Sequence, residues 1–314
     1  MNMNQFLQDV KEGLSSPSKY LQSKYFYDAA GDVIFQQIMN CPEYYLTRSE
    51  MEIFTTQTKQ IADIFINDSL EFDIVELGAG DATKSVHLLK ELLSKKVSFT
   101  YFPVDIYTHV IHQLNEKLPA ELPGLKLEGL NGEYFTMLKK AKTISNKIKV
   151  VLFLGSNIGN IPLENCGKFC SALRGHLNIG DLVLIGFDLQ KEPQVILDAY
   201  NDNGGFTRNF NLNLLRRINH ELSGNFDVNQ FKHYATYDPE SGACKSYLIS
   251  LKDQQVEIAD HTFSFAKYEP VYMEVSQKFT VAQTNEMAIN NGFKPVHHFY
   301  DSKGWFVDAV WQCV

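Results

Sequence analysis

The chain has 314 residues, 44% of them hydrophobic, so it can bury a substantial core and exceeds the size expected of one simple α/β unit. A formal net charge of −8 argues against a nucleic-acid partner, because a phosphate backbone is bound by basic surfaces. The 5 cysteines are odd in number and widely spread, which favours a reducing, cytoplasmic setting without disulfides.

The chain lacks the patterns typical of export, membrane insertion or metal binding. Residues 1–14 have no apolar run of the kind found in signal peptides, and the longest apolar run, residues 150–154, is far too short to span a bilayer. Cys166 and Cys170 fall on one helix face, but no further cysteine or histidine follows at metal-ligand spacing. We therefore expect no metal site and no membrane partner. We also expect a monomer.

Two parts of the chain do not fit a strand–helix alternation. The first, residues 1–60, holds aromatic-rich stretches at residues 24–32 and 42–50. The second, residues 191–278, predicts helices followed by strands. These elements are helices over residues 195–200 and 210–222 and strand-like runs over residues 232–251 and 262–265. We interpret residues 1–60 and 191–278 as one discontinuous α+β substrate-binding domain.

A turn after the first apolar strand, residues 73–77, is the strongest local signal for a ligand. The strand places Glu76 near its carboxyl end and runs into Gly78 and Gly80. Glycines allow the backbone to turn sharply and to approach a ligand that any β-carbon would exclude. The turn therefore predicts a nucleotide-sized notch.

The residues around this turn favour S-adenosylmethionine over a dinucleotide. A dinucleotide site has a third glycine near position 83, where the chain has Thr83, and Asp81 would repel phosphates. S-adenosylmethionine carries a sulfonium and an ammonium and no phosphate, so carboxylates attract it.

The next strand, residues 98–105, follows a predicted helix over residues 82–93 and ends in Asp105. A carboxylate at this strand end is placed to accept both ribose hydroxyls. An acid at a strand end also serves as a helix cap or turn residue, so the glycines and Asp105 alone leave both roles open.

The alternation continues and predicts a Rossmann-like, doubly wound α/β sheet. The further expected elements are strands over residues 125–130, 149–154, 181–188, 296–300 and 305–311 and helices over residues 164–177 and 281–291. The last two strands are expected at an antiparallel edge. We assign residues 61–190 and 279–314 to the cofactor-binding domain.

Six separated blocks, in order, resemble one known family, the histidine Nα-methyltransferases that start ergothioneine biosynthesis. The blocks are residues 24–29, 42–48, 153–160, 186–202, 210–211 and 274–279. The resemblance runs nearly end to end, and it implies a methyltransferase that uses S-adenosylmethionine, with the amino-acid substrate between two lobes.

The resemblance assigns the substrate's amine to Tyr27 and Asn160 and its carboxylate to Tyr44 and Tyr200. Neutral partners suit an amine that must attack, because a carboxylate there would hold the ammonium form and withhold the lone pair. Taken alone, each tyrosine would be interpreted as a half-buried packing residue.

The same resemblance assigns the imidazole of histidine to Glu274 and Ser276, which lie two apart on a predicted strand, and adds Thr207 to the substrate-binding residues. The chain departs from the family at Ser246, where a methionine is usual beside the substrate ring. This departure leaves the identity of the amino acid more open than the reaction type.

On the cofactor side, the resemblance extends the predicted residues from Glu76, Gly78, Gly80 and Asp105 to a second set. This set is Lys84, Glu133, Gly155 and Ser156. Glu133 stands where the family has aspartate and keeps an acid for the adenine amino group.

The expected function is N-methylation of the α-amine of a free amino acid, most directly L-histidine to trimethylhistidine. Two alternatives stay open: the same chemistry on a different amino acid or small amine, and a catalytically inactive cofactor-binding regulatory protein.

Overall fold

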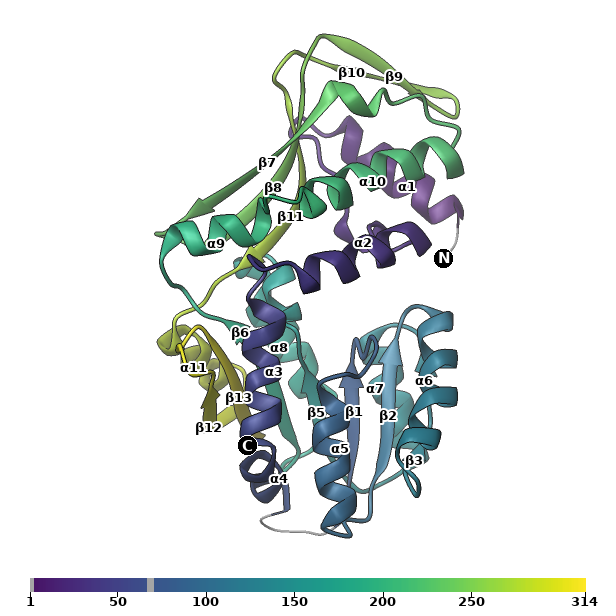
Figure 1. Cartoon of the computed structure of the whole chain (residues 1–314). Coiled ribbons are helices and arrows are strands. Elements are labelled where there is room, and N and C mark those ends of the chain that lie inside the picture. The colour runs from purple at the N-terminus through teal and green to yellow at the C-terminus, as the bar shows by residue number, and fades with distance from the viewer. Residues whose placement is uncertain (1–2, 67–70) are drawn as a thin grey trace. The chain divides into compact units, whose positions relative to one another are not determined.

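A computed structural model describes residues 3–66 and 71–314, and the chain forms two compact units (Figure 1). Unit 1 comprises Met1–Tyr45 and Lys191–Ser276, and unit 2 comprises Leu46–Gln190 and Gln277–Val314. The domain bounds expected from the sequence put residues 46–60 with the first piece, whereas their contacts place them in unit 2. Residues 1–2 and 67–70, which both expected domains include in part, lie outside the described residues.

Unit 2 is built on a sheet of order β12-β13-β6-β5-β1-β2-β3, with β4 also paired to β2. The strands are β1 (Phe72–Leu77), β2 (Thr100–Asp105), β3 (Lys126–Leu127), β4 (Leu130–Asn131), β5 (Ile148–Phe153), β6 (Leu182–Asp188), β12 (Phe293–Tyr300) and β13 (Phe306–Cys313). β6, β5, β1 and β2 are parallel, while β13 is antiparallel to β6 and β12 to β13. The expected doubly wound sheet with an antiparallel edge is confirmed.

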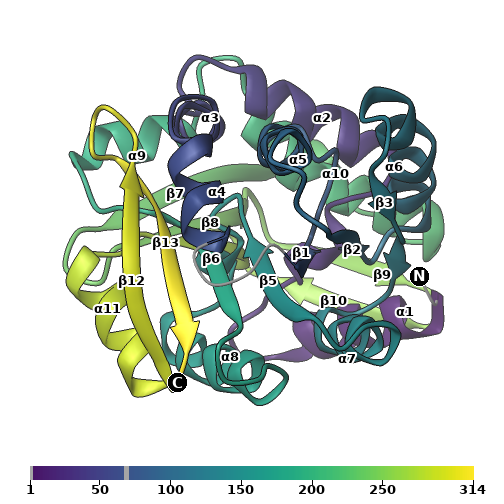
Figure 2. The same cartoon turned by 90° about the horizontal axis from the view of Figure 1, so that it is seen from below.

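Helices cover both faces of this sheet (Figure 2). One face carries α3 (Leu46–Thr56), α4 (Thr58–Ile66), α5 (Ser85–Ser94) and α6 (Thr108–Glu121), and the other carries α7 (Tyr134–Ile144), α8 (Leu163–Gly175) and α11 (Val281–Asn290). Alternate strand residues serve the two cores: on β5, Val150 faces one and Val151 the other. This two-sided burial explains why the central strands are almost wholly apolar.

One expected strand, residues 125–130, is wrong as a single element. The structure breaks it into β3 and β4, and the last ladder bond before the break runs from the N–H of Glu128 to the carbonyl of Tyr101 at 2.9 Å. Gly129 lies so close to α6 that a β-carbon there would be 2.5 Å from Ile111 Cγ2. The packing of α6 therefore overrides a continuous strand.

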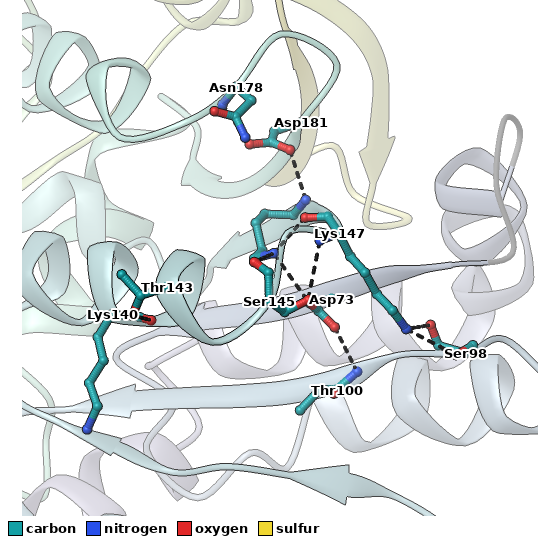
Figure 3. A network of polar contacts seen from close by, with 10 residues as sticks. Asp73, Ser98, Thr100, Lys140, Thr143, Ser145, Lys147, Asn178 and Asp181 are labelled. Carbon is teal, nitrogen blue, oxygen red and sulfur yellow. Dashed lines mark hydrogen bonds and ion pairs between the residues drawn. The ribbon is translucent and has the colours of Figure 1, made fainter.

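A buried polar network joins the amino ends of β1, β5 and β6 (Figure 3). The Lys149 ammonium donates to Asp73 Oδ2 at 3.1 Å and to the carbonyls of Ser145 and Lys147 at 2.9 and 2.6 Å. The N–H of Lys149 donates to Asp181 Oδ1 at 2.9 Å. All three ammonium hydrogens thus have acceptors, which is what a buried charge requires.

Unit 1 combines helices with antiparallel strands around a separate core (Figure 1). Its elements are α1 (Met3–Ser15), η1 (Ser23–Tyr25), α2 (Ala29–Asn40), α9 (Pro193–Tyr200), α10 (Phe206–Glu221), η3 (Val228–Gln230), a sheet of β11 (Pro270–Gln277), β8 (Ala243–Ser250) and β7 (Phe231–Asp238), and the pair β9 (Gln254–Ile258) and β10 (His261–Phe265). α10 packs against α2 and β7. Asp28 ties these helices together, since it caps α2 through the Gly31 N–H at 2.7 Å and accepts from Asn213 on α10 at 2.8 Å.

Three features are absent from residues 3–66 and 71–314. No helix there has the length and apolar character needed to cross a bilayer. No group of three or more histidine, cysteine, aspartate or glutamate side chains is arranged to hold a metal ion, and no disulfide is formed.

Candidate functional site

The turn after β1 has the backbone conformation that its glycines predict. Gly78 and Gly80 have φ of 74° and 53°, in the left-handed region that favours glycine. The N–H groups of Gly78 and Ala79 both donate to the carbonyl of Val104, at 2.8 and 3.1 Å, and fasten the turn to β2. A β-carbon at Gly78 would lie 3.0 Å from the hydroxyl of Tyr134, so a larger residue would strain the backbone and displace the tyrosine side chain.

Asp105 ends β2 beside this turn and is 8% exposed. Its Oδ2 accepts from the N–H of Gly80 at 3.3 Å, and its Oδ1 accepts from the N–H of Tyr107 at 3.0 Å. The carboxylate therefore joins the glycine turn to the loop after β2. The sequence left two roles open for Asp105, a ribose contact and a turn contact. The turn contact is present in the structure, and it places the carboxylate beside the predicted notch.

Glu76 is buried, with 3% exposure, at the carboxyl end of β1. Burial raises the pKa of its carboxyl to about 7, although a hydrogen bond from the Tyr101 hydroxyl acts to lower it. The side chain therefore changes charge near neutral pH. A cation bound close by would favour the ionised form.

A second turn follows β5 and resembles the first in conformation. Gly155 and Ser156 have φ of 74° and 54°, and the N–H of Asp188 donates to Ser156 Oγ at 3.1 Å. The N–H of Gly155 donates to Glu50 Oε1 at 2.8 Å and Oε2 at 3.0 Å. Glu50 also pairs with the ammonium of Lys84, so this one carboxylate joins the second turn to the segment that follows the first.

Two further predicted residues of unit 2 lie on its surface. Glu133 is exposed immediately before α7, and Asn160 is exposed at the end of η2 (Asn157–Asn160), the short helix that follows the second turn. The side chain of Asn157, in the same short helix, approaches both glycine turns, because β-carbons at Gly78 and Gly155 would lie 3.3 and 3.8 Å from its Nδ2.

In unit 1, the structure brings together three of the predicted substrate-binding residues. The Tyr200 hydroxyl and Ser276 Oγ are 2.6 Å apart, and the rings of Tyr44 and Tyr200 meet edge to face with centroids 6.0 Å apart. The carbonyl of Tyr200 is 3.0 Å from His233 Nε2. A buried histidine on β7 thus fixes the end of α9 that carries Tyr200.

The other predicted residues of unit 1 occupy separate positions. Tyr27 packs edge to face on Phe35 and Phe210, with centroids 5.4 and 5.3 Å apart. Thr207, Ser246 and Glu274 lie on α10, β8 and β11, the first two buried and Glu274 half-buried. Thr207 Oγ1 is buried and has no hydrogen-bond partner within the described part of the chain, so a polar acceptor or donor is available there.

Sequence reasoning missed Glu50, Asn157 and Tyr134 as residues of the glycine turns. Glu50 is the last residue of the second aromatic-rich stretch. The signal that could have identified it is an acid on the buried side of an amphipathic helix. Asn157 and Tyr134 follow Gly155 and Gly132 by two residues each, but only the fold shows that their side chains approach the first turn.

The arrangement in unit 2 fits a cationic, phosphate-free ligand. Acids stand at the ends of β1 and β2, and Asp81 accepts from the N–H and hydroxyl of Thr83 at 3.1 and 2.8 Å within the first turn. A phosphate would meet these carboxylates at close range, whereas a sulfonium or ammonium would be attracted.

Comparison with known proteins extends these observations to the whole chain. A model of the family described as histidine-specific, S-adenosylmethionine-dependent methyltransferase matches residues 6–313. Histidine N-alpha-methyltransferases of Mycolicibacterium smegmatis and Mycobacterium tuberculosis are 33% and 32% identical over 300 residues, covering 95% of this chain and 92% of each protein. Ergothioneine biosynthesis protein 1 of Schizosaccharomyces pombe is 26% identical over 285 residues, which cover 89% of this chain and 37% of that protein.

Proposed function

The chain belongs to the family of histidine-specific, S-adenosylmethionine-dependent methyltransferases, and we propose that it methylates the α-amine of free L-histidine to trimethylhistidine. The observation that carries the proposal is the family match over residues 6–313, together with 33% identity to a histidine N-alpha-methyltransferase over 95% of the chain. The similarity extends through both units, so it includes the segments that carry the predicted substrate residues.

We assign the cofactor to the two glycine turns of unit 2. Asp105 would accept the ribose hydroxyls, and Glu76 would supply negative charge for the cofactor's ammonium. Lys84, whose side chain is 20% exposed, would face the carboxylate of the cofactor's amino-acid end. Glu133, exposed before α7, would accept the adenine amino group.

We assign the α-amine of histidine to Tyr27 and Asn160. Both are uncharged hydrogen-bonding groups, so neither stabilises the ammonium form that cannot attack. Tyr44 and Tyr200 would donate to the carboxylate, and the edge-to-face contact of their rings, at 6.0 Å between centroids, supports a joint role.

The imidazole is assigned to Glu274 and Ser276, with Thr207 and Ser246 as further polar contacts. The Tyr200 hydroxyl and Ser276 Oγ are 2.6 Å apart, which supports placing the carboxylate and ring contacts close together in unit 1. A serine at position 246 in place of a larger side chain would leave space beside the ring.

S-adenosylmethionine supplies a methyl group on a sulfonium, which is already a good leaving group. The chain therefore has to position the amine in line with the methyl group, exclude water and leave the amine uncharged. Tyr27 and Asn160 hold it by hydrogen bonds that permit rotation about the C–N bond between rounds. The proton can pass to bulk water when the site opens between rounds, so no general base is required.

The direct test is incubation of the pure protein with methyl-labelled S-adenosylmethionine and single amino acids, with products identified by mass spectrometry. We expect label in mono-, di- and trimethylhistidine and none in other amino acids. Transfer only to another amine would contradict the substrate assignment. Binding of the cofactor without transfer to any amine would contradict the enzymatic proposal.

We extend the proposal to ergothioneine formation, because a related protein of Schizosaccharomyces pombe carries that name. A cell that lacks this chain should stop producing ergothioneine and resume when supplied with trimethylhistidine. We also propose a cytoplasmic monomer; light scattering of the pure protein tests the oligomeric state, and fractionation of the cells tests the location.

A further inference from the structure

Two buried carboxyl groups meet above one glycine in the sheet of unit 2. Asp308 on β13 is paired across the ladder with Gly186 on β6, and Glu50 reaches the same place from α3. A β-carbon at Gly186 would overlap Glu50 Oε1 and lie 3.1 Å from Asp308 Oδ1. Glu50 is 1% exposed and Asp308 is 0% exposed, so both carboxyls are out of contact with solvent.

The partners of Glu50 require it to be ionised. Both of its oxygens accept from the N–H of Gly155, at 2.8 and 3.0 Å, and it pairs with the ammonium of Lys84. Each of these groups is a donor, and a protonated Glu50 would give up one of the acceptors that they need.

Asp308 has the opposite surroundings. Both of its carboxyl oxygens are buried without a hydrogen-bond partner within residues 3–66 and 71–314. A buried carboxylate with no donor is strongly unfavourable, whereas a protonated carboxyl can donate to the neighbouring Glu50. One proton between the two groups removes the repulsion and satisfies both.

We propose that Asp308 is protonated and donates to Glu50, and that this carboxyl pair positions Lys84 and the Gly155 N–H at the two glycine turns. Asp308 and Glu50 are positioning residues, because they act through the turns and not on the substrate. The inference rests on the proposed function, which assigns the cofactor to these turns.

The electrostatics of the cluster agree with this distribution of charge. Burial and the Glu50 carboxylate raise the pKa of Asp308 well above its usual range, and Lys84 offsets this only in part. Burial acts to lower the pKa of Lys84, but the neighbouring acids, Glu50 foremost and then Asp308 and Glu76, together leave the pKa raised, so the ammonium stays charged. The remaining acid facing this group is Glu76 on β1.

The test compares the affinity of three variants for S-adenosylhomocysteine by calorimetry. Asp308→Asn keeps a donor toward Glu50, so its Kd should stay within roughly twofold of the parent. Asp308→Leu removes the donor and Glu50→Gln removes the charge that holds Lys84, so both should weaken binding by at least about tenfold. Rescue by asparagine but not by leucine distinguishes a proton donor from a space-filling residue.

Asp73→Asn is the matched control. It changes a fully buried acid at the other end of the same sheet, so it should lower the melting temperature without changing the Kd for S-adenosylhomocysteine. Parent-level binding by Glu50→Gln would overturn the inference, as would equal losses in Asp308→Asn and Asp308→Leu. Absence of binding by the parent protein would instead contradict the cofactor assignment, so the two failures are distinguishable.

Discussion

Glu76 illustrates how burial at a strand end sets the charge of a single side chain. It lies at 3% exposure with the Tyr101 hydroxyl as a partner, and burial raises its pKa from 4.5 to about 7. Without a cationic ligand, the ionised form of Glu76 is therefore unfavourable in the folded protein. That combination is typical of a binding residue and not of one selected for stability.

The raised pKa predicts a pH-dependent cost in stability. Below pH 4.5 both folded and unfolded chains hold the proton, so there is no cost; between 4.5 and about 7 only the unfolded chain ionises. Above about pH 7 the full cost is about 3 kcal/mol. Relative to the parent, Glu76→Gln should therefore gain about 3 kcal/mol in free energy of unfolding between pH 4 and pH 8, measured by urea titration. An unchanged difference between the two proteins across that range would contradict the assignment.

A second residue-scale prediction separates substrate from cofactor. Glu274→Ala removes the proposed ring contact, a charged hydrogen bond worth about 1.5–3 kcal/mol, so the KM for histidine should rise by roughly tenfold or more. Its Kd for S-adenosylhomocysteine should stay at the parent value, whereas Asp105→Ala should show the reverse pattern. Glu257→Ala, an exposed acid on β9 in the same unit, is the control and should change neither constant. Equal loss of both affinities in Glu274→Ala would refute the assignment.

At the scale of elements, β6, β13 and α3 form one functional contact. β6 has to carry glycine at position 186, because the carboxyls of Glu50 and Asp308 occupy the space of a side chain there. The same contact holds the second glycine turn through the N–H of Gly155. Strand packing and turn geometry are therefore coupled.

Gly186→Ala tests this coupling. The added methyl group forces the Glu50 carboxylate off its partners, so we expect a loss of about 1–3 kcal/mol in free energy of unfolding and weaker binding of S-adenosylhomocysteine. Gly175→Ala in α8 is the matched control, because nothing lies within 4 Å of a β-carbon there. It should be neutral or stabilising by up to about 1 kcal/mol. Parent-like stability and binding in Gly186→Ala would show that the carboxyl pair can move freely.

At the scale of the whole molecule, the buried ion-pair network and the proposed cofactor site lie at opposite ends of one sheet. The amino ends of β1, β5 and β6 are joined by the Lys149 network (Figure 3). The glycine turns and the strand-end acids lie at the carboxyl ends of the parallel strands. The first set is fully hydrogen-bonded within the protein. At the carboxyl ends, by contrast, Glu76 has a raised pKa and the glycines of the turns have positive φ.

Lys149→Met should therefore affect folding alone. It leaves the buried Asp73 carboxylate without its cation, which costs about 3–5 kcal/mol, while the folded protein should bind S-adenosylhomocysteine with the parent Kd. Denaturant unfolding and calorimetry at a temperature where the variant is folded measure the two quantities. Adding Asp73→Leu should recover part of the stability, since it removes the unpaired charge. A cofactor affinity that falls with stability would contradict the separation.

The sequence by itself determined the features that depend on neighbouring residues. These include the apolar strands of the doubly wound sheet, the sharp turn at Gly78 and Gly80, the acids at the ends of β1 and β2, and the family, through blocks in a fixed order. Each follows from local rules, such as the conformational freedom of glycine and the burial of central strands on both faces.

Only the tertiary structure decided which distant side chains share a site. It split the expected strand over residues 125–130, moved residues 46–60 into unit 2 and brought Glu50 to Asp308 over Gly186. No local pattern predicts such a meeting, because whether a buried acid finds a donor, a cation or another acid depends on which elements pack against it.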